Sequence, residues 1–153
     1  MIIDDITYTM EYIEEITQNL GDTLSKESYY IEDQGCPHVQ PSLPKGYAAI
    51  YIFTYGTDKE YECLKIGKVN VNSAARFKSQ HYGFSAPSTL AKSICKDKKF
   101  AQMGINEDNV KKWMLNNLHR INVFINAEQG KAITELVEAI LHYRFRPRYE
   151  GNI

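Results

Sequence analysis

Four side chains of different chemistry are spread over the last two thirds of the chain: a phenol (Tyr51), an ammonium (Lys65), a guanidinium (Arg76) and a carboxylate (Glu138). A hard cation such as Mg²⁺ prefers carboxylate and water ligands. A guanidinium presents a planar fork that suits phosphate oxygens, and a phenol, with a pKa of ~10, ionises more readily beside a cation. Brought together, these groups would suit chemistry at a phosphodiester, which needs an activated water and charge stabilisation at phosphorus.

Tyr51 and Lys65 lie in two segments whose composition predicts β-strands. Residues 47–55 are rich in β-branched and aromatic side chains, and residues 63–69 form the next candidate strand. Between them, Gly-Thr-Asp-Lys-Glu at 56–60 favours a hairpin loop. The two residues are therefore expected on neighbouring antiparallel strands.

The length of this loop predicts which side chains face each other. If Tyr55 pairs with Tyr61 across five residues, Tyr51 lies opposite Lys65. Opposed residues of an antiparallel pair share a face, with Cβ atoms ~4.5–5.5 Å apart. A slip of two residues would keep the pair on one face, whereas a slip of one would separate it. We expect a phenol beside an ammonium on one side of a sheet.

Helical segments carry the other two residues. After the hairpin, Asn72 or Ser73 can cap a short helix over residues 74–81, which contains Arg76. Further on, Asn106 is expected to cap another helix, and the alternation over residues 121–125 predicts a third strand.

The last helix has apolar residues at i, i+3, i+4, i+7 and i+8: Ile133, Leu136, Val137, Ile140 and Leu141. Glu138 lies roughly 130° from the centre of this stripe and Glu135 roughly 170°. Glu138 can therefore point into a cleft over the sheet, whereas Glu135 is expected in solvent. His142, one turn after Glu138, is expected on the helix surface.

The order and spacing of these segments resemble the GIY-YIG nuclease family over roughly residues 46–151. Where the family's first strand bears Gly-Ile-Tyr, this chain has Ala49-Ile50-Tyr51, and where its second bears Tyr-Ile-Gly, the chain has Lys65-Ile66-Gly67. The family's helical arginine corresponds to Arg76. Its metal-binding glutamate and Pro-x-Tyr-Asn ending correspond to Glu138 and Pro147-Arg148-Tyr149-Glu150.

Three residues depart from the family pattern. Ala49 stands for the glycine of the first motif, a mild change in a strand. Lys65 stands for the tyrosine of the second motif, a substitution also found in some restriction-enzyme members of the family. Glu150 stands for the usual asparagine near the metal site.

The resemblance implies metal-dependent hydrolysis of DNA phosphodiester bonds. Glu138 would hold Mg²⁺ or Mn²⁺, Arg76 the scissile phosphate, and Tyr51 with Lys65 the nucleophilic water. Two assignments of the general base stay open: the Tyr51 phenol helped by the Lys65 cation, or Lys65 itself. The alternative function is a non-catalytic nucleic-acid-binding module on the same fold, which the Glu150 departure favours slightly.

The distribution of charge supports a polyanionic partner such as DNA. Residues 1–40 hold one basic and nine acidic side chains, a net charge of −8, whereas residues 41–120 hold thirteen basic and six acidic, a net charge of +7. Lys68 and Lys78 are the expected contacts to the nucleic-acid backbone. His81, five residues after Arg76, either reaches a phosphate or is an ordinary surface histidine.

Composition excludes several other classes. Hydrophobic residues make up 43% and charged residues 24% of the 153 residues, as in an ordinary globular protein. No apolar run approaches the ~18–20 residues of a membrane helix, and the acidic N-terminus fits neither a signal nor a transit peptide. Three separated cysteines argue against a disulfide framework and favour a cytoplasmic location.

The acidic N-terminal region is expected to be a helix over residues 6–20 followed by a linker or draped arm over residues 21–46. This helix packs on the core or on a second copy of the chain, imitates DNA to shield the basic cleft, or docks another protein. A homodimer or a protein partner through this arm follows from two of those alternatives.

Together these features predict an α+β fold: a small, mainly antiparallel three-stranded sheet flanked by helices, with an N-terminal helical arm. Residues 1–45 would form the acidic helix and linker, and residues 46–153 the GIY-YIG-like nuclease domain.

Overall fold

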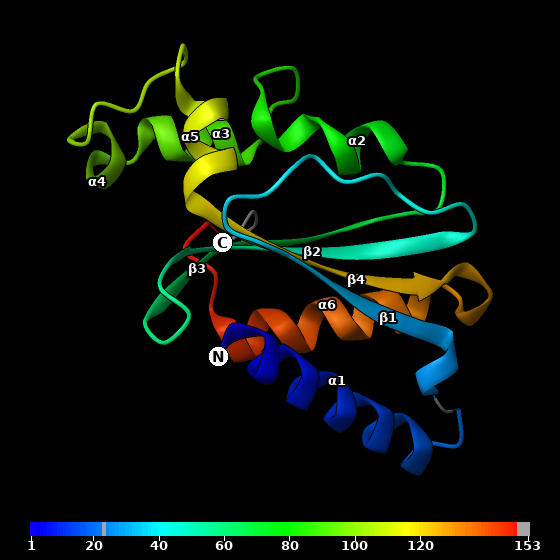
Figure 1. Ribbon diagram of the computed structural model, residues 1–153. Coiled ribbons are helices and arrows are strands. Elements are labelled where there is room, and N and C mark those ends of the chain that lie inside the picture. The colour runs from blue at the N-terminus through cyan, green and yellow to red at the C-terminus, as the bar shows by residue number, and fades with distance from the viewer. Residues whose placement is uncertain (23, 150–153) are drawn as a thin grey trace.

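A four-stranded antiparallel sheet lies between two groups of helices (Figure 1). The computed structural model describes residues 1–22 and 24–149. Within these residues the strands are β1 (Tyr29–Gly35), β2 (Tyr47–Gly56), β3 (Tyr61–Val69) and β4 (Leu118–Asn126). Their order across the sheet is β1-β4-β2-β3, so β1 and β3 are its edges. The expected α+β class is confirmed.

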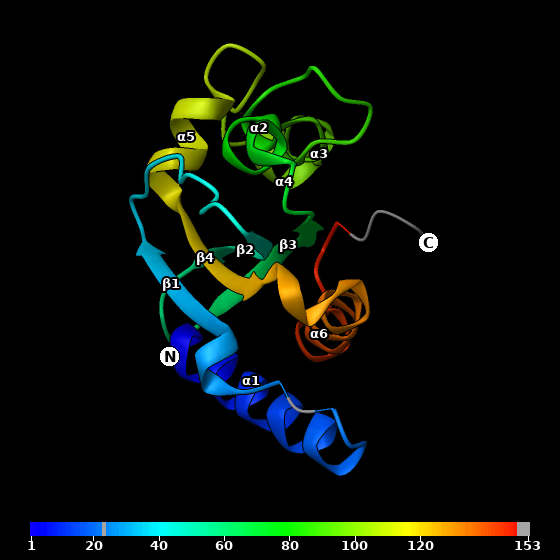
Figure 2. The same ribbon diagram turned by 90° about the vertical axis from the view of Figure 1, so that its right-hand side faces the viewer.

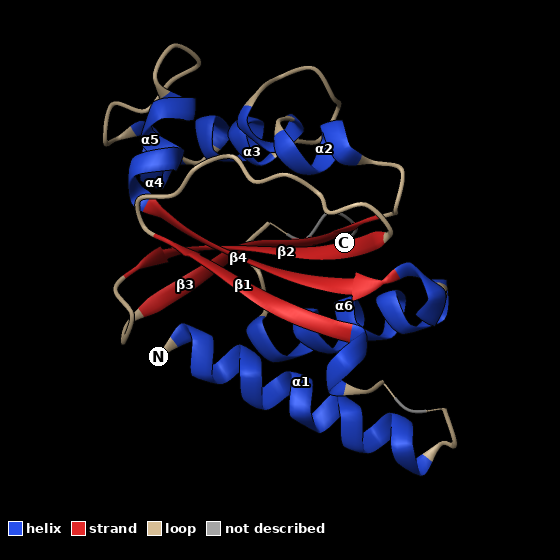
Figure 3. Cartoon of the chain, turned by 45° about the vertical axis from the view of Figure 1, so that its right-hand side comes forward, coloured by secondary structure: helices blue, strands red, loops and turns tan. Residues whose placement is uncertain are grey.

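The helices cover both faces of the sheet (Figures 2 and 3). On one face lie α1 (Ile2–Asn19) and α6 (Lys131–Phe145). On the other lie α2 (Ala74–Lys78), α3 (Leu90–Lys96), α4 (Lys98–Ala101) and α5 (Val110–Asn117). Over the described ranges, no helix combines the length and the apolarity that crossing a membrane would require.

Strand β2 is apolar on both sides because each face of the sheet is covered. Ile50 and Ile52 pack toward α1 and α6, whereas Tyr51 and Phe53 pack into the second core, beneath α2 to α5. A strand buried on both faces loses the alternation of a half-exposed strand and becomes a continuous apolar run.

The expectation of three strands is wrong, because β1 forms within the segment predicted to be a linker. Strand β1 pairs antiparallel with β4, from Tyr29 opposite Ile125 to Gly35 opposite Arg120. Its sequence includes Glu32 and Asp33, residues that strands generally disfavour. Pairing with a partner about ninety positions away stabilises β1, and local composition carries no signal of such pairing.

The β2–β3 hairpin has a different register from the expected one. Tyr51 lies opposite Gly67, and Lys65 lies opposite Phe53. Next to the loop, Gly56 pairs with Tyr61, one residue away from the expected register. A β-bulge between Phe53 and Thr54 adds a second residue, so the pairing at Tyr51 differs from the expected one by two. Tyr51 and Lys65 therefore stay on one face of the sheet, displaced by one pair along it.

Two helix boundaries also differ from expectation. The predicted helix over residues 74–81 is divided into α2 and a 3-10 turn, Gln80–Tyr82. The predicted cap at Asn106 is wrong, since α5 begins at Val110 with Asn109 as its N-cap. The Asn109 side chain instead accepts a hydrogen bond from the Asn106 amide, which closes the turn before the helix.

The acidic helix α1 packs on the core, as one of the alternatives proposed. Ile2, Ile6, Met10 and Ile13 are buried against the sheet and α6. Its carboxylates contact side chains on the same side of the molecule, such as Asp5 with the Tyr61 hydroxyl at 2.6 Å. This position leaves the basic part of the other layer uncovered by α1.

Arg120 is the most unusual residue of the core, since β4 places its guanidinium where no solvent reaches. Nε donates to the side-chain oxygen of Asn122 (3.1 Å), Nη1 to the Tyr82 hydroxyl (2.9 Å) and Nη2 to the Phe77 carbonyl (2.8 Å). The guanidinium also lies 4.6 Å from the centre of the Phe77 ring. Asn122 in turn donates to Glu32 of β1 at 2.9 Å, which links the buried charge to a carboxylate.

His38 extends this network into the segment that connects β1 to β2. Its Nδ1 lies 2.7 Å from the Leu118 carbonyl and its Nε2 lies 2.7 Å from the Tyr82 hydroxyl. A carbonyl only accepts, so Nδ1 carries the proton and Nε2 accepts from Tyr82. Burial lowers the pKa of His38 to about 4, in agreement with a neutral ring.

Replacing the buried guanidinium should destabilise the protein. In Arg120→Gln, the shorter amide cannot satisfy all three acceptors, and we expect the free energy of unfolding to fall by about 2–4 kcal/mol. Urea unfolding followed by circular dichroism measures this change. Arg144→Gln is the control, since Arg144 is half-exposed and 3.7 Å from Asp5, and should cost less than about 0.5 kcal/mol. Equal stability of the two variants would contradict the structural role of Arg120.

Candidate functional site

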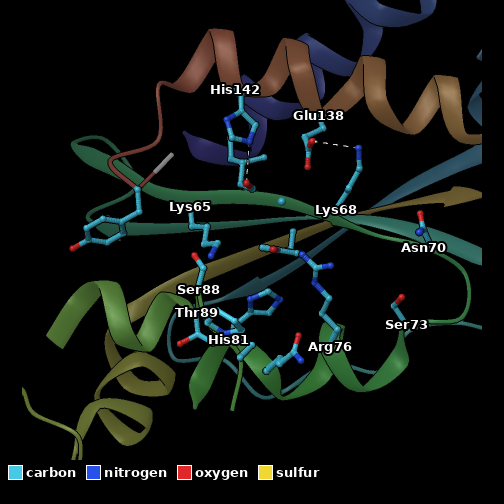
Figure 4. Close-up of a pocket in the computed structure, with 17 residues that line it drawn as sticks. Lys65, Lys68, Asn70, Ser73, Arg76, His81, Ser88, Thr89, Glu138 and His142 are labelled. Carbon is cyan, nitrogen blue, oxygen red and sulfur yellow. Dashed lines mark hydrogen bonds and ion pairs between the residues drawn. The ribbon is translucent and has the colours of Figure 1, made fainter. Parts of the chain in front are cut away.

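A cavity of about 690 Å³ opens at the β3 edge of the sheet, between α6 and α2 (Figure 4). Because β3 pairs only with β2 among the described strands, side chains from both helical layers can meet around its free edge. The chemically active side chains in the lining are Tyr51, Lys65, Lys68, Arg76, His81, Glu138, His142 and Tyr149.

The fold thus brings together all four predicted catalytic residues and two of the three predicted nucleic-acid contacts. Strand β2 supplies Tyr51, β3 supplies Lys65 and Lys68, and α2 supplies Arg76. Glu138 reaches the cavity from α6 on the opposite layer (Figure 4). Lys78 is exposed and lies outside this lining, and its contact with a nucleic-acid backbone stays a prediction.

Gly67 allows the Tyr51 side chain to lie across the neighbouring strand. The two residues are opposite each other in the sheet, and a methyl group built at Gly67 would overlap the Tyr51 hydroxyl and come within 2.9 Å of Cε2. Tyr51 is only 2% exposed. The close approach explains in physical terms why glycine occupies the end of the Lys65-Ile66-Gly67 sequence.

His81 is buried, which excludes one of the two alternatives for it, an ordinary surface histidine. Its ring centre lies 4.0 Å from that of Tyr51. Its Nε2 is buried with no hydrogen-bond partner in the part of the chain that the structure describes. Burial lowers the pKa of His81 to about 3, and neighbouring cations, Arg120 first among them, act in the same direction. His81 is therefore neutral at pH 7 and contributes a polar edge to the cavity without a charge.

The environments of Tyr51 and Lys65 shift their pKa values in opposite directions. Burial raises the pKa of the Tyr51 phenol, although the adjacent Arg76 guanidinium opposes this effect. Burial, followed by repulsion from Arg76, lowers the pKa of the Lys65 ammonium. Both shifts are in the direction of the neutral form of the side chain, and neither favours a phenolate–ammonium ion pair.

Glu138 is the only carboxylate that lines the cavity, counting the described residues. Its side chain is 24% exposed whereas that of Glu135 is 63% exposed, as the helix geometry predicted. No cluster of three acidic, histidine or cysteine side chains that could hold a metal occurs in residues 1–22 and 24–149. A cation bound here would therefore rely on Glu138, water and phosphate oxygens, which is a usual arrangement for Mg²⁺.

His142 and the end of the described chain occupy the remaining edge of β3. The Nε2–H of His142 donates to the Ile66 carbonyl at 2.9 Å, so the expectation that His142 lies on the helix surface is wrong. The amides of Arg148 and Tyr149 donate to the carbonyls of Cys63 and Leu64, each at 2.9 Å. These contacts satisfy edge groups of the strand and close one end of the cavity.

An ion-pair cluster fixes that end of the cavity to the opposite helical layer. Arg148 contacts Asp97 at 2.6 Å and Glu62 at 2.9 Å, and the Tyr149 hydroxyl donates to Asp97 at 2.6 Å. Hydrogen bonds from Arg148 hold the pKa of Asp97 far below its usual range. This ion-pair cluster joins the segment after α6 to the start of α4, across the β3 edge.

Two lysines near the cavity, Lys92 and Lys99, have partners within the protein. Lys92 donates to the Ala86 carbonyl at 2.5 Å and shapes the loop that lines the cavity. Lys99 pairs with Glu62 at 2.7 Å. Lys68 remains in the lining, 3.7 Å from Glu138.

Sequence reasoning missed His142 and gave Tyr149 no role. The spacing of His142 from Glu138, one helical turn, was an available signal, because residues four apart share a helix face. Tyr149 reaches the cavity only through the path of the chain after α6, which no periodicity indicates. Glu150, the departure from the family ending, lies outside the described residues.

Comparison with known proteins adds no relative: no family model, no curated protein and no solved structure matches this chain.

A methyl group at Gly67 should displace Tyr51. In Gly67→Ala the new Cβ overlaps the phenol, and we expect a loss of about 1–3 kcal/mol in unfolding free energy. Gly83→Ala is the matched control, since nothing lies within 4 Å of its Cβ position. The two variants are compared by chemical denaturation. A Gly67→Ala protein as stable as the Gly83→Ala protein would show that Tyr51 does not lie over the strand.

The two buried histidines predict acid sensitivity. Their pKa values, about 4 for His38 and about 3 for His81, lie below the ordinary 6.5. The unfolded chain therefore binds more protons, and stability should fall as pH drops below about 6.5, by on the order of 1 kcal/mol per pH unit for each histidine. Unfolding free energies at pH 7.5 and 5.5 test this. His81→Gln should lose about half of the pH dependence, and an unchanged slope would contradict the buried neutral ring.

Proposed function

We propose that this protein is a metal-dependent endonuclease that hydrolyses DNA phosphodiester bonds, with a GIY-YIG-like nuclease domain over residues 46–153. The observation that carries the proposal is the meeting of Tyr51, Lys65, Arg76 and Glu138 in one cavity, although they come from four separate elements. These are the residues that the family motifs would supply. If the short motifs matched only by chance, these four side chains would rarely lie in one cavity.

The charge of the cavity supports a phosphate substrate. Three basic side chains, Lys65, Lys68 and Arg76, line the cavity together with one carboxylate among the described residues. Such an excess of positive charge favours an anion with several oxygens, and Arg76 can engage two of them through its planar fork. Arg76 would hold the scissile phosphate and stabilise the charge that develops there.

Glu138 would hold Mg²⁺ or Mn²⁺ through its carboxylate. When bound, such a cation supplies Lewis-acid stabilisation at the phosphate and assists the leaving oxygen. Neutral oxygens of Asn70 and Ser73 also face the cavity and can bind the water around it. Because one carboxylate is a weak anchor by itself, the substrate phosphate would complete the site.

The pKa shifts favour Lys65 over Tyr51 as the group that accepts the proton of the attacking water. A general base must be deprotonated before it accepts a proton, and burial shifts Lys65 in the direction of its deprotonated form, the neutral amine. Burial moves Tyr51 away from phenolate. Tyr51 would therefore keep its proton and orient the water by a hydrogen bond.

Cleavage of supercoiled plasmid tests the function. Purified protein with Mg²⁺ or Mn²⁺ should nick or linearise the plasmid, EDTA should stop it, and Glu138→Gln should reduce the rate by about a thousandfold or more. Glu128→Gln is the matched control, since Glu128 is exposed on the turn before α6 and remote from the lining. Lys65→Met is expected to lose more activity than Tyr51→Phe.

The outcome of this assay also separates the two candidate functions. Salt-sensitive DNA binding without cleavage by the wild type would favour the non-catalytic binding module. Equal cleavage by wild type and Glu138→Gln would exclude Glu138 as the metal ligand.

A further inference from the structure

The carboxylate proposed as the metal ligand already has a cationic partner within the protein. Lys68 Nζ lies 3.7 Å from an oxygen of Glu138 and 3.7 Å from an oxygen of Glu135. Figure 4 shows the Lys68 side chain directed from the edge strand toward α6. The two glutamates are three residues apart on α6, so their side chains emerge on neighbouring positions of one helix face.

This arrangement cannot persist unchanged when a divalent cation binds Glu138. An ammonium and a metal ion at one carboxylate repel each other, and both are attracted by the same negative charge. Glu138 is the single carboxylate of the lining as far as the structure describes the chain, so the metal has no alternative acidic ligand there. Binding of the metal would therefore favour movement of Lys68 away from Glu138.

Glu135 offers Lys68 a second position. The lysine is equally distant from both carboxylates, and at 3.7 Å neither contact is a tight hydrogen bond. The Glu135 side chain is far more exposed than that of Glu138, 63% against 24%. A rotation of the flexible lysine side chain toward Glu135 would free Glu138 without a movement of the backbone.

From this geometry we infer that Lys68 acts as an internal competitor of the divalent cation at Glu138, and that Glu135 receives Lys68 when the cation binds. The inference rests on the proposed metal site. Lys68 is a positioning residue that acts through Glu138. It keeps metal affinity low in the free protein, and a DNA phosphate, which attracts both Lys68 and the metal, restores it.

Direct binding of Mn²⁺ to the full-length protein in the absence of DNA tests the inference. The free Mn²⁺ signal in electron paramagnetic resonance reports the dissociation constant without any turnover. Lys68→Gln should bind Mn²⁺ about three- to tenfold more tightly than the wild type, because it removes one competing cation. Glu135→Gln should bind it more weakly, because Lys68 then has Glu138 as its only carboxylate partner.

Two controls separate competition from a general charge effect. Lys78→Gln makes the same charge change at an exposed lysine outside the cavity lining and should leave the dissociation constant unchanged. Lys68→Arg keeps the charge and should bind Mn²⁺ as weakly as the wild type. In the double variant Lys68→Gln, Glu138→Gln, the gain in affinity should disappear.

The results distinguish failure of this inference from failure of the proposed metal site. If Lys68→Gln binds Mn²⁺ no more tightly than Lys78→Gln, competition by Lys68 is wrong. If the gain in Lys68→Gln persists when Glu138 is also replaced, the metal binds elsewhere, and both the inference and Glu138 as metal ligand are wrong. If Glu138→Gln alone abolishes binding while Lys68→Gln changes nothing, the metal site stands and only the competition is wrong.

Discussion

The buried guanidinium of Arg120 is the interaction on which the candidate site most depends. It binds the Phe77 carbonyl at the end of α2 and the Tyr82 hydroxyl in the following 3-10 turn. This short segment carries Arg76 and His81, and a five-residue helix has little stability of its own. The hydrogen bonds from Arg120 therefore fix the position of this segment over the sheet. A buried charge without hydrogen-bond partners is very unfavourable. The partners of Arg120 and of Asn122 thus hold α2, β4 and β1 in one arrangement.

The second constraint is the free edge of β3. An unpaired strand edge exposes backbone groups that must be satisfied or protected, and here the chain uses its own later segments. His142 satisfies the Ile66 carbonyl, and the amides of residues 148 and 149 satisfy Cys63 and Leu64. The opening that remains is the cavity. Edge protection and site construction are thus achieved by the same residues, since α6 brings Glu138 to the edge together with His142.

The sequence allowed the main elements to be predicted wherever their signal was local. The apolar spacing of α6, the composition of β2 and the family motifs led to four side chains that do share one cavity. The predictions that were wrong concern elements whose structure depends on residues far away in the sequence. Strand β1 is stabilised by pairing with β4. The hairpin register differs from the expected one because the loop is one residue shorter and because a bulge follows Phe53, and the turn residues indicated neither. The burial of Arg120 and His81 could not be predicted either, since a charged or polar residue in a strand or turn is normally expected at the surface.

The electrostatic state of the cavity follows from its excess of basic side chains. Burial and repulsion from Arg76 lower the pKa of Lys65, and His81 is neutral. Lys68 contacts Glu138, the one carboxylate of the lining among the described residues. Each of these conditions reduces the local positive charge or compensates it. A phosphate in the cavity would provide part of that compensation itself, which would release Lys68 from Glu138. The availability of Glu138 to a metal ion would then depend on the arrival of an anion beside Arg76.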